Sequence, residues 1–173
     1  MNDNNQKLLE GFNCIARADA RILILGSMPG QISLTKEQYY AHPRNSFWRI
    51  MAEMFGFNPE LPYEKRLPLI QQQGIALWDV VHRCKRKGSL DADIKQQTVE
   101  ANNFQQLFND CPDIHHVFFN GQKAASLYKT HVLPGLEPNT SLHYQTLPST
   151  SPAHASLGHD QKYQQWLCIK ERL

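Results

Sequence analysis

The feature that most constrains the fold is a series of four short strand-like runs, the first two of them strongly apolar, separated by segments of helical character. The runs lie at residues 21–26, 75–81, 114–121 and from 141 onward. Continuous apolar runs of this length are typical of strands buried on both faces of a parallel sheet. Strands that alternate with helices indicate an α/β fold. We therefore predict a three-layer α/β/α sandwich around a central, mainly parallel sheet of four or five strands.

The segments between these runs predict the helices and loops. Ser46 is a possible N-cap for the first helix, and Gly74 is expected to end the second. Residues 27–34 and 82–95 are expected to form loops, the second of them polar and basic. Helices are expected at residues 46–55, 58–74, 102–112, 122–132 and 160–173.

Length and composition indicate one globular domain over residues 1–173. The chain is 41% hydrophobic and 20% charged, which is typical of a globular protein. It is long enough to bury a hydrophobic core without the help of disulfide bonds or bound metals. The net charge of +2 permits nucleic-acid binding through a local patch without arguing for it. No apolar stretch approaches the roughly 18 residues of a membrane span, and the first residues are polar. We expect a cytoplasmic, nucleoid-associated monomer.

The four cysteines are far apart, and no two of them form a C-x-x-C pair. A zinc or iron–sulfur site normally shows at least one close pair, and a chain of this size does not need a disulfide framework. We therefore expect free thiols, no metal and no cofactor.

A binding site is expected at the carboxyl edge of the sheet. The right-handed crossover rule places the strand-to-helix loops of a parallel sheet at that edge. Unusual residues gather in the loops that would lie there, at 26–30, 78–84, 120–121 and 148–156.

Residues 26–30, GSMPG, place two glycines around a proline directly after a strand. The spacing matches neither the dinucleotide-binding nor the P-loop pattern, and Ser27 does not lie in a G-x-S-x-G elbow. A nucleotide-binding enzyme and a serine hydrolase therefore have no support, and taken alone the segment indicates a tight turn.

The segment that begins at Tyr39 combines aromatic, basic and amide side chains before a helix. Tyr39 and Tyr40 either sandwich a planar ligand or cap the core. Asn45 either caps the helix or acts in a site. His42 and Arg44 are as compatible with solvent as with function.

Two further segments carry polar side chains at the expected edge. Asp79 lies within an apolar strand, which indicates either a buried ion pair or polar recognition. The basic cluster that follows fits either a solvated loop or phosphate contact. The hydroxyl-rich 147–156 segment fits either phosphate binding or a plain loop. The basic residues are Lys85, Arg86 and Lys87.

Together these segments resemble the uracil-DNA glycosylase superfamily, from about residue 21 to residue 156. They look most like its hypoxanthine (deoxyinosine) branch, with the mismatch-specific uracil-DNA glycosylases as close relatives. The most specific piece is AHPRNSFWRIM, which resembles the A-H-P-x-N-x-F-W-x-V-I segment of the mismatch enzymes. GSMPG stands where those enzymes have G-I-N-P-G, and LPSTSPAHAS where they have L-P-N-P-S-G-L-S. GIALWDVV resembles the base-reading strand of the superfamily.

The resemblance implies a monofunctional glycosylase that flips a deaminated base out of DNA and hydrolyses its N-glycosidic bond. In G-I-N-P-G the asparagine positions the attacking water, and here that position is Met28. A thioether can neither orient nor activate water. In the hypoxanthine branch the asparagine after H-P-x takes the role, so the resemblance makes Asn45 the catalytic residue.

The resemblance also implies which residues hold the base. Tyr40 would stack on the purine, and Asp79 would accept the N1–H that hypoxanthine has and adenine lacks. Asn120 is either a second reader of the base or part of a structural turn. The implied base-binding residues are Gly26, Ser27, Met28, Tyr40, Asp79 and Asn120.

The remaining implied site residues would contact the DNA strand. Ala153 and His154 stand where relatives use leucine as a wedge, and a weaker wedge would suit mismatched or single-stranded substrates. The implied DNA-binding residues are His42, Arg44, Lys85, Arg86, Ser149, Thr150, Ser151, Ala153 and His154.

Two other functions stay open at this point. One is a uracil or G:T/U mismatch glycosylase on the same scaffold. The other is a catalytically inactive relative that only binds nucleic acid, an alternative that Met28 keeps open and the intact H-P-R-N segment argues against.

Overall fold

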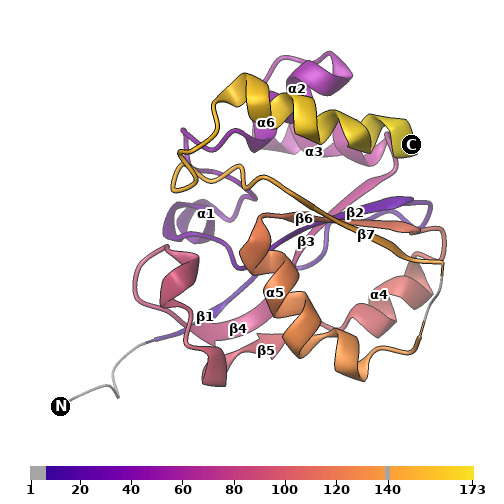
Figure 1. Cartoon of the computed structure of the whole chain (residues 1–173). Helices are drawn as coiled ribbons and strands as arrows, with labels where there is room; N and C mark the ends of the chain where they lie inside the picture. The colour runs from indigo at the N-terminus through magenta and orange to yellow at the C-terminus, as the bar shows by residue number, and fades with distance from the viewer. Residues whose placement is uncertain (1–6, 139–140) are drawn as a thin grey trace.

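The computed structural model describes residues 7–138 and 141–173 (Figure 1). The first six residues, which begin the polar N-terminal segment, lie outside that description. The strands are β1 (Leu8–Glu10), β2 (Ile22–Gly26), β3 (Ile75–Asp79), β4 (Val81–Lys85), β5 (Glu100–Ala101), β6 (His116–Asn120) and β7 (His143–Leu147). The α-helices are α1 (Gln31–Lys36), α2 (Phe47–Phe55), α3 (Tyr63–Gln71), α4 (Phe104–Asp110), α5 (Gln122–His131) and α6 (His159–Trp166), and 3₁₀ helices cover Asp91–Asp93, Gln96–Thr98, Leu133–Gly135 and Leu167–Arg172.

The central sheet has four strands in the order β3-β2-β6-β7, and every neighbouring pair is parallel. The predicted parallel sheet is therefore confirmed, with four strands. From β2 the chain continues to β3 on one side, and it later returns to β6 on the other. The connections after β2 and β6 therefore run to opposite sides of the sheet, which leaves a crevice between them at the carboxyl edge. Open α/β sheets bind their ligands in this crevice.

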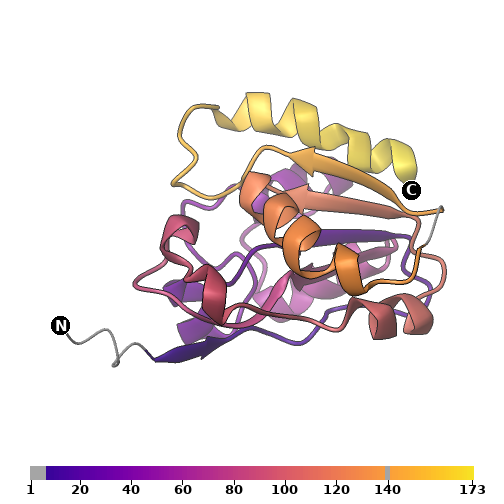
Figure 2. The same ribbon diagram turned by 60° about the horizontal axis from the view of Figure 1, so that its bottom comes forward.

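Helices cover both faces of this sheet, which confirms the three-layer sandwich (Figures 1 and 2). Strand β2 is buried along its whole length, and its side chains alternate between the two cores. Ile22 and Ile24 pack into the core beneath α2, α3 and α6, whereas Leu23 and Leu25 pack into the core beneath α4 and α5. Each such side chain contributes about 1.5–3 kcal/mol by burial.

A second, antiparallel sheet of order β1-β4-β5 was not expected from the sequence. The prediction of a loop throughout 82–95 is wrong for its first residues, which belong to β4. The register shifts between Val81 and Arg83, which breaks the period-two pattern that reveals a strand. The predicted loop at 27–34 is likewise interrupted by α1.

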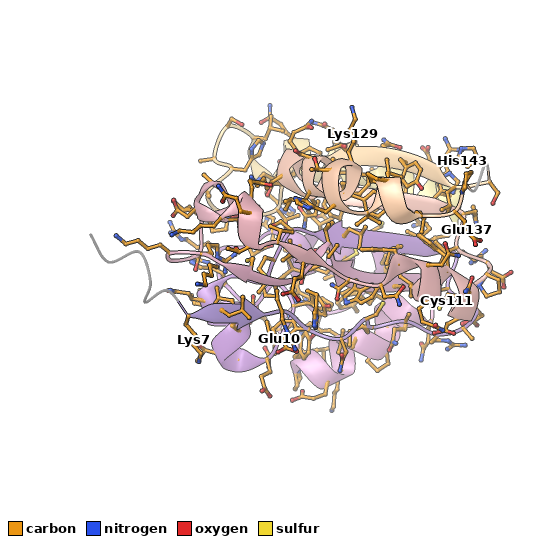
Figure 3. The ribbon with its side chains drawn as sticks, turned by 90° about the horizontal axis from the view of Figure 1, so that it is seen from below. Lys7, Glu10, Cys111, Lys129, Glu137 and His143 are labelled. Carbon is orange, nitrogen blue, oxygen red and sulfur yellow. The ribbon has the colours of Figure 1, made fainter. Side chains whose placement is uncertain are left out.

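All four cysteines are free, as predicted, and two of them, Cys84 and Cys111, are buried. Figure 3 shows Cys111 and His143, the first residue of β7, at the opposite end of the molecule from Lys7. Within residues 7–138 and 141–173, no helix is long and apolar enough to cross a membrane. No group of three or more His, Cys, Asp or Glu side chains converges there to hold a metal ion.

Candidate active site

A cavity of about 650 Å³ opens at the carboxyl edge of the sheet, in the size range of small-molecule sites. In Figure 1 the segments around it gather at the left, where α1, the Asp91–Asp93 turn and the loop between β7 and α6 lie together. Of the predicted site residues, only Lys85 and Arg86 are not among those that line the cavity. Those that line it are Gly26, Ser27, Met28, Tyr40, His42, Arg44, Asn45, Asp79, Asn120, Ser149, Thr150, Ser151, Ala153 and His154.

Asp79 ends β3 and is paired in register with Gly26 at the end of β2. The two residues are so close that a Cβ on Gly26 would collide with Oδ1 of Asp79, so a glycine is required there. Asp79 is 4% exposed, and its Oδ2 has no hydrogen-bond partner in the structure. Burial raises the pKa of Asp79 to about 7, with a further contribution from the charge of Asp91 and an opposing one from Arg86. Asp79 is therefore a buried, unpaired acceptor at the cavity.

Tyr40 and Tyr39 have different roles, which the sequence left open. Tyr39 is buried in the core, and its hydroxyl donates to the backbone carbonyl of Asn13 at 3.0 Å. Tyr40 adopts a left-handed backbone (φ 56°), and its ring stacks on Phe47 with 4.0 Å between ring centroids. The Tyr40 hydroxyl is buried without a hydrogen-bond partner. Burial, followed by the charge of Asp79, holds its pKa well above its usual range, so it remains a neutral donor.

Asn45 caps α2 and lines the cavity at the same time. Its Oδ1 accepts a hydrogen bond from the backbone N–H of Phe47 at 3.0 Å, which holds the amide in one orientation. Ser46 occupies the N-cap position of α2, as expected, but its side chain makes no capping hydrogen bond. A carbonyl oxygen has two lone pairs, so Asn45 Oδ1 can accept one further hydrogen bond, for example from a water molecule.

Met28 occupies the loop after β2 but contributes its side chain to the core. The Met28 side chain is 5% exposed and belongs to the core cluster. Its sulfur lies beside Gly11, 3.7 Å from the point where a Cβ on that glycine would be. The position that carries the water-binding asparagine in the resembling G-I-N-P-G segment therefore offers no polar group to the cavity.

Thr150 and Asn120 connect three parts of the site. The side-chain amide of Asn120 donates to Thr150 Oγ1 and accepts from the Thr150 backbone N–H, both at 2.8 Å. The Thr150 carbonyl accepts from the backbone N–H of Ser46 at 3.0 Å. Thr150 is 0% exposed, so its side chain is engaged within the protein here, and a DNA contact of this residue stays a prediction. These hydrogen bonds connect the backbone next to Asn45 to the end of β6 through Thr150 and Asn120.

Arg86 is held within the fold in this structure, and its role in DNA binding stays a prediction. This residue is 4% exposed, and its guanidinium donates to the carbonyls of Gly88, Met28 and Pro29. A buried guanidinium is stable where carbonyls satisfy its donors, so Arg86 fastens its own loop to the loop after β2. Lys85, on β4, does not line the cavity, and its role in DNA binding stays a prediction.

The sequence did not reveal that residues 89–92 and α1 also line the cavity. Ser27 Oγ donates to Asp91 Oδ1 at 2.6 Å, and the backbone N–H of Gln31 donates to Ser89 Oγ at 2.9 Å. Burial raises the pKa of Asp91, and the Ser27 hydrogen bond opposes that shift. No pattern in the sequence signals these contacts, because Arg86 brings the segment into place from within the fold.

The loop after β7 forms another side of the cavity. It is supported by Lys162 of α6, which is 4% exposed and donates from Nζ to the carbonyl of His154 at 2.8 Å. Ser151 Oγ accepts from the backbone N–H of Ala153 at 3.2 Å, which tightens the turn. Ser149 and Ser151 remain partly exposed and able to contact a phosphate.

Comparisons with known proteins identify relatives of this chain. Two curated relatives are named hypoxanthine DNA glycosylase. The protein from Methanosarcina barkeri is 40% identical over 116 residues, which is 66% of this chain and 72% of that protein. The protein from Methanosarcina acetivorans is 38% identical over 133 residues, which is 72% of this chain and 83% of that protein.

A solved structure extends the similarity to nearly the whole fold. The solution NMR structure of a proposed uracil DNA glycosylase from Methanosarcina acetivorans matches with a TM-score of 0.79 and 33% identity, over 94% of this chain and 96% of that one. The family model of the uracil DNA glycosylase superfamily matches residues 14–169. The chain belongs to the uracil DNA glycosylase superfamily.

Proposed function

We propose that this DNA glycosylase removes hypoxanthine from DNA by hydrolysis of the N-glycosidic bond and leaves an abasic site. The observation that carries the proposal is the pairing of two features in one cavity: the unpaired, buried carboxyl of Asp79 and the oriented amide of Asn45. The names of the two curated relatives support the same substrate.

Asp79 provides the means of base recognition. A carboxylate accepts a hydrogen bond from the N1–H of hypoxanthine, whereas adenine presents a lone pair at N1 and leaves the buried charge unpaired. A site whose buried polar group pairs with the substrate strongly rejects an analogue that cannot form that hydrogen bond. An apolar pocket discriminates between similar ligands much more weakly. The unpartnered hydroxyl of Tyr40 offers a donor in the same region, which can pair with an acceptor of the base.

Asn45 provides the means of hydrolysis. Its Oδ1 accepts a hydrogen bond from water and directs the water oxygen to the anomeric carbon. A neutral amide is a weak base, so its main contribution is position rather than proton abstraction. As the bond breaks, positive charge develops on the sugar and negative charge on the departing base. Donors around the base, such as the Tyr40 hydroxyl and the amides of residues 26–30, would stabilise that anion.

The ionisation of Asp79 predicts a pH dependence. Only the ionised carboxylate discriminates hypoxanthine from adenine, because a protonated carboxyl can both donate and accept. The pKa of Asp79 is about 7, so the ionised fraction falls about tenfold for each pH unit below that value. We expect the ratio of kcat/KM for hypoxanthine to that for adenine to rise with pH and level off above about 7. Single-turnover rates on both substrates, from two units below that pKa to one unit above it, measure this; a pH-independent ratio would contradict it.

The substrate is tested with a panel of otherwise identical duplexes that carry hypoxanthine, uracil, xanthine or mispaired thymine. After incubation with the protein, hot alkali cleaves the strand at each abasic site. The proposal expects the fastest cleavage for hypoxanthine and no cleavage when the alkali step is omitted. Faster reaction of uracil or mispaired thymine would assign the chain to the alternative substrate class, and cleavage without alkali would contradict a monofunctional glycosylase.

The DNA contacts follow from the cavity rim. We propose that Arg44 and His42 on one side, and Ser149, Ser151 and His154 on the other, contact the strand that carries the flipped nucleotide. The protein is proposed to act as a monomer on the nucleoid of the cytoplasm.

A further inference from the structure

Leu90 is the most exposed large hydrophobic side chain of the described residues. It is 54% exposed and lines the mouth of the cavity, and Ile32 of α1, which is 37% exposed, lines the same cavity. The other exposed large hydrophobic residues are Leu8, Leu133 and Tyr144, and none of them lines the cavity. Large apolar side chains that meet water beside a binding cavity indicate a surface that contacts a partner.

Leu90 stands on a well-supported loop. Its two neighbours are fastened to the first loop of the site: Ser89 Oγ accepts from the Gln31 N–H at 2.9 Å, and Asp91 accepts from the Ser27 hydroxyl at 2.6 Å. Arg86, which precedes Leu90 in the chain, donates to the carbonyls of Met28 and Pro29 in the loop after β2. These contacts hold the backbone in place while the leucine side chain remains in solvent.

The hydrogen bond between the Gln31 N–H and Ser89 Oγ joins the two segments that carry the apolar side chains. Ile32 directly follows Gln31, and Leu90 directly follows Ser89. Both side chains line the same cavity. They form an apolar rim next to the space into which the base would enter.

The loop after β7 cannot supply an apolar wedge. Its exposed tip carries Ala153, which is small, and His154, whose Nε2 lies 3.3 Å from the Ser156 hydroxyl. When a base leaves the stack, enzymes fill the gap with an apolar side chain to offset the cost of unstacking. Among the described residues that line the cavity, Leu90 has a side chain of that size and exposure, and it comes from a different segment of the chain.

We infer that Leu90, supported by Ile32, is the wedge that enters the base stack when the damaged nucleotide is flipped into the cavity. This inference rests on the proposed function. The wedge therefore belongs to the segment between β4 and β5 rather than to the loop after β7. A side chain with this role assists extrusion from a duplex and is not needed for a base that is already unstacked.

The inference is tested by Leu90→Ala on two substrates, hypoxanthine in a fully paired duplex and hypoxanthine in the same strand alone. We expect the single-turnover rate at subsaturating enzyme to fall about tenfold on the duplex, equivalent to about 1.4 kcal/mol, and to stay unchanged on the single strand. Leu90→Phe, which keeps a large apolar side chain, should retain most of the duplex activity. Leu133→Ala is the matched control, because Leu133 is 40% exposed and lies outside the cavity.

Two results would overturn the inference. An unchanged duplex rate for Leu90→Ala would show that no wedge acts there, and an equal loss on both substrates would assign Leu90 to base binding instead. Failure of the proposed function has a different signature, since the wild-type protein would then release no hypoxanthine from either substrate.

Discussion

Asn45→Ala is expected to lower the single-turnover rate of hypoxanthine excision by about 10²–10³-fold, the range lost when a group that positions a reactant is removed. The variant removes the oxygen that would orient water, and Met28 offers no polar group in compensation. Binding of hypoxanthine DNA should change little, because Asn45 acts on water rather than on the base. Single-turnover excision at saturating protein, together with the binding constant for the same duplex, separates the two effects.

The control must account for the second role of Asn45. Oδ1 also caps α2, and the loss of such a cap costs about 0.5–2 kcal/mol of stability. Asn45→Ser is the matched variant, because serine caps a helix about as well as asparagine but its hydroxyl ends closer to the backbone. We expect near wild-type thermal stability and a rate as low as that of Asn45→Ala. A serine variant with full activity would mean that only the cap matters.

Asp79→Asn is expected to lower excision of hypoxanthine about tenfold at pH 8, because a neutral hydrogen bond to N1–H is weaker than a charge-assisted one by about 1–1.5 kcal/mol. Discrimination against adenine should fall as well, since a carboxamide can turn to present either a donor or an acceptor. Parallel assays on hypoxanthine and adenine measure both effects. If the variant excises hypoxanthine as fast as the wild type, Asp79 does not read the base.

The same substitution should stabilise the fold at high pH. Folding raises the pKa of Asp79 from 3.8 to about 7, so the folded protein holds this proton more tightly than the unfolded chain. The stability that Asp79 contributes is therefore complete below pH 3.8 and is lost as the pH rises to about 7. Asparagine is neutral throughout, so the variant should gain up to a few kcal/mol above that pH, at about 1.4 kcal/mol per pKa unit, and nothing in acid. Thermal melts at both ends of this range measure the gain.

Much of the fold was predictable because β2 and the runs that pair with it are short, apolar and separated by helices. Those patterns also place their loops at one edge, which is why the sequence alone groups Gly26, Asp79 and Asn120. The small antiparallel sheet could not be predicted in this way. Its strand β4 is polar and irregular, and it exists because β1 and β5, from distant parts of the chain, pair with it.

Residue roles within the site were harder to predict than its location. Thr150 and Ser151 are adjacent hydroxyl residues in one loop, yet Thr150 is fully buried and Ser151 is partly exposed. Arg86 belongs to a basic run, yet only the fold shows that it faces backbone carbonyls rather than solvent. Composition does not distinguish such neighbours, because the direction of each side chain depends on contacts made far away in the sequence.

The central claim is that this chain releases hypoxanthine from DNA by means of Asn45. Its most direct test is mass-spectrometric detection of the free base, under single-turnover conditions, from a duplex that contains deoxyinosine. The account predicts stoichiometric free hypoxanthine with the wild-type protein and almost none over the same time with Asn45→Ser. Absence of free hypoxanthine with the wild type, or equal release by the two proteins, would contradict it.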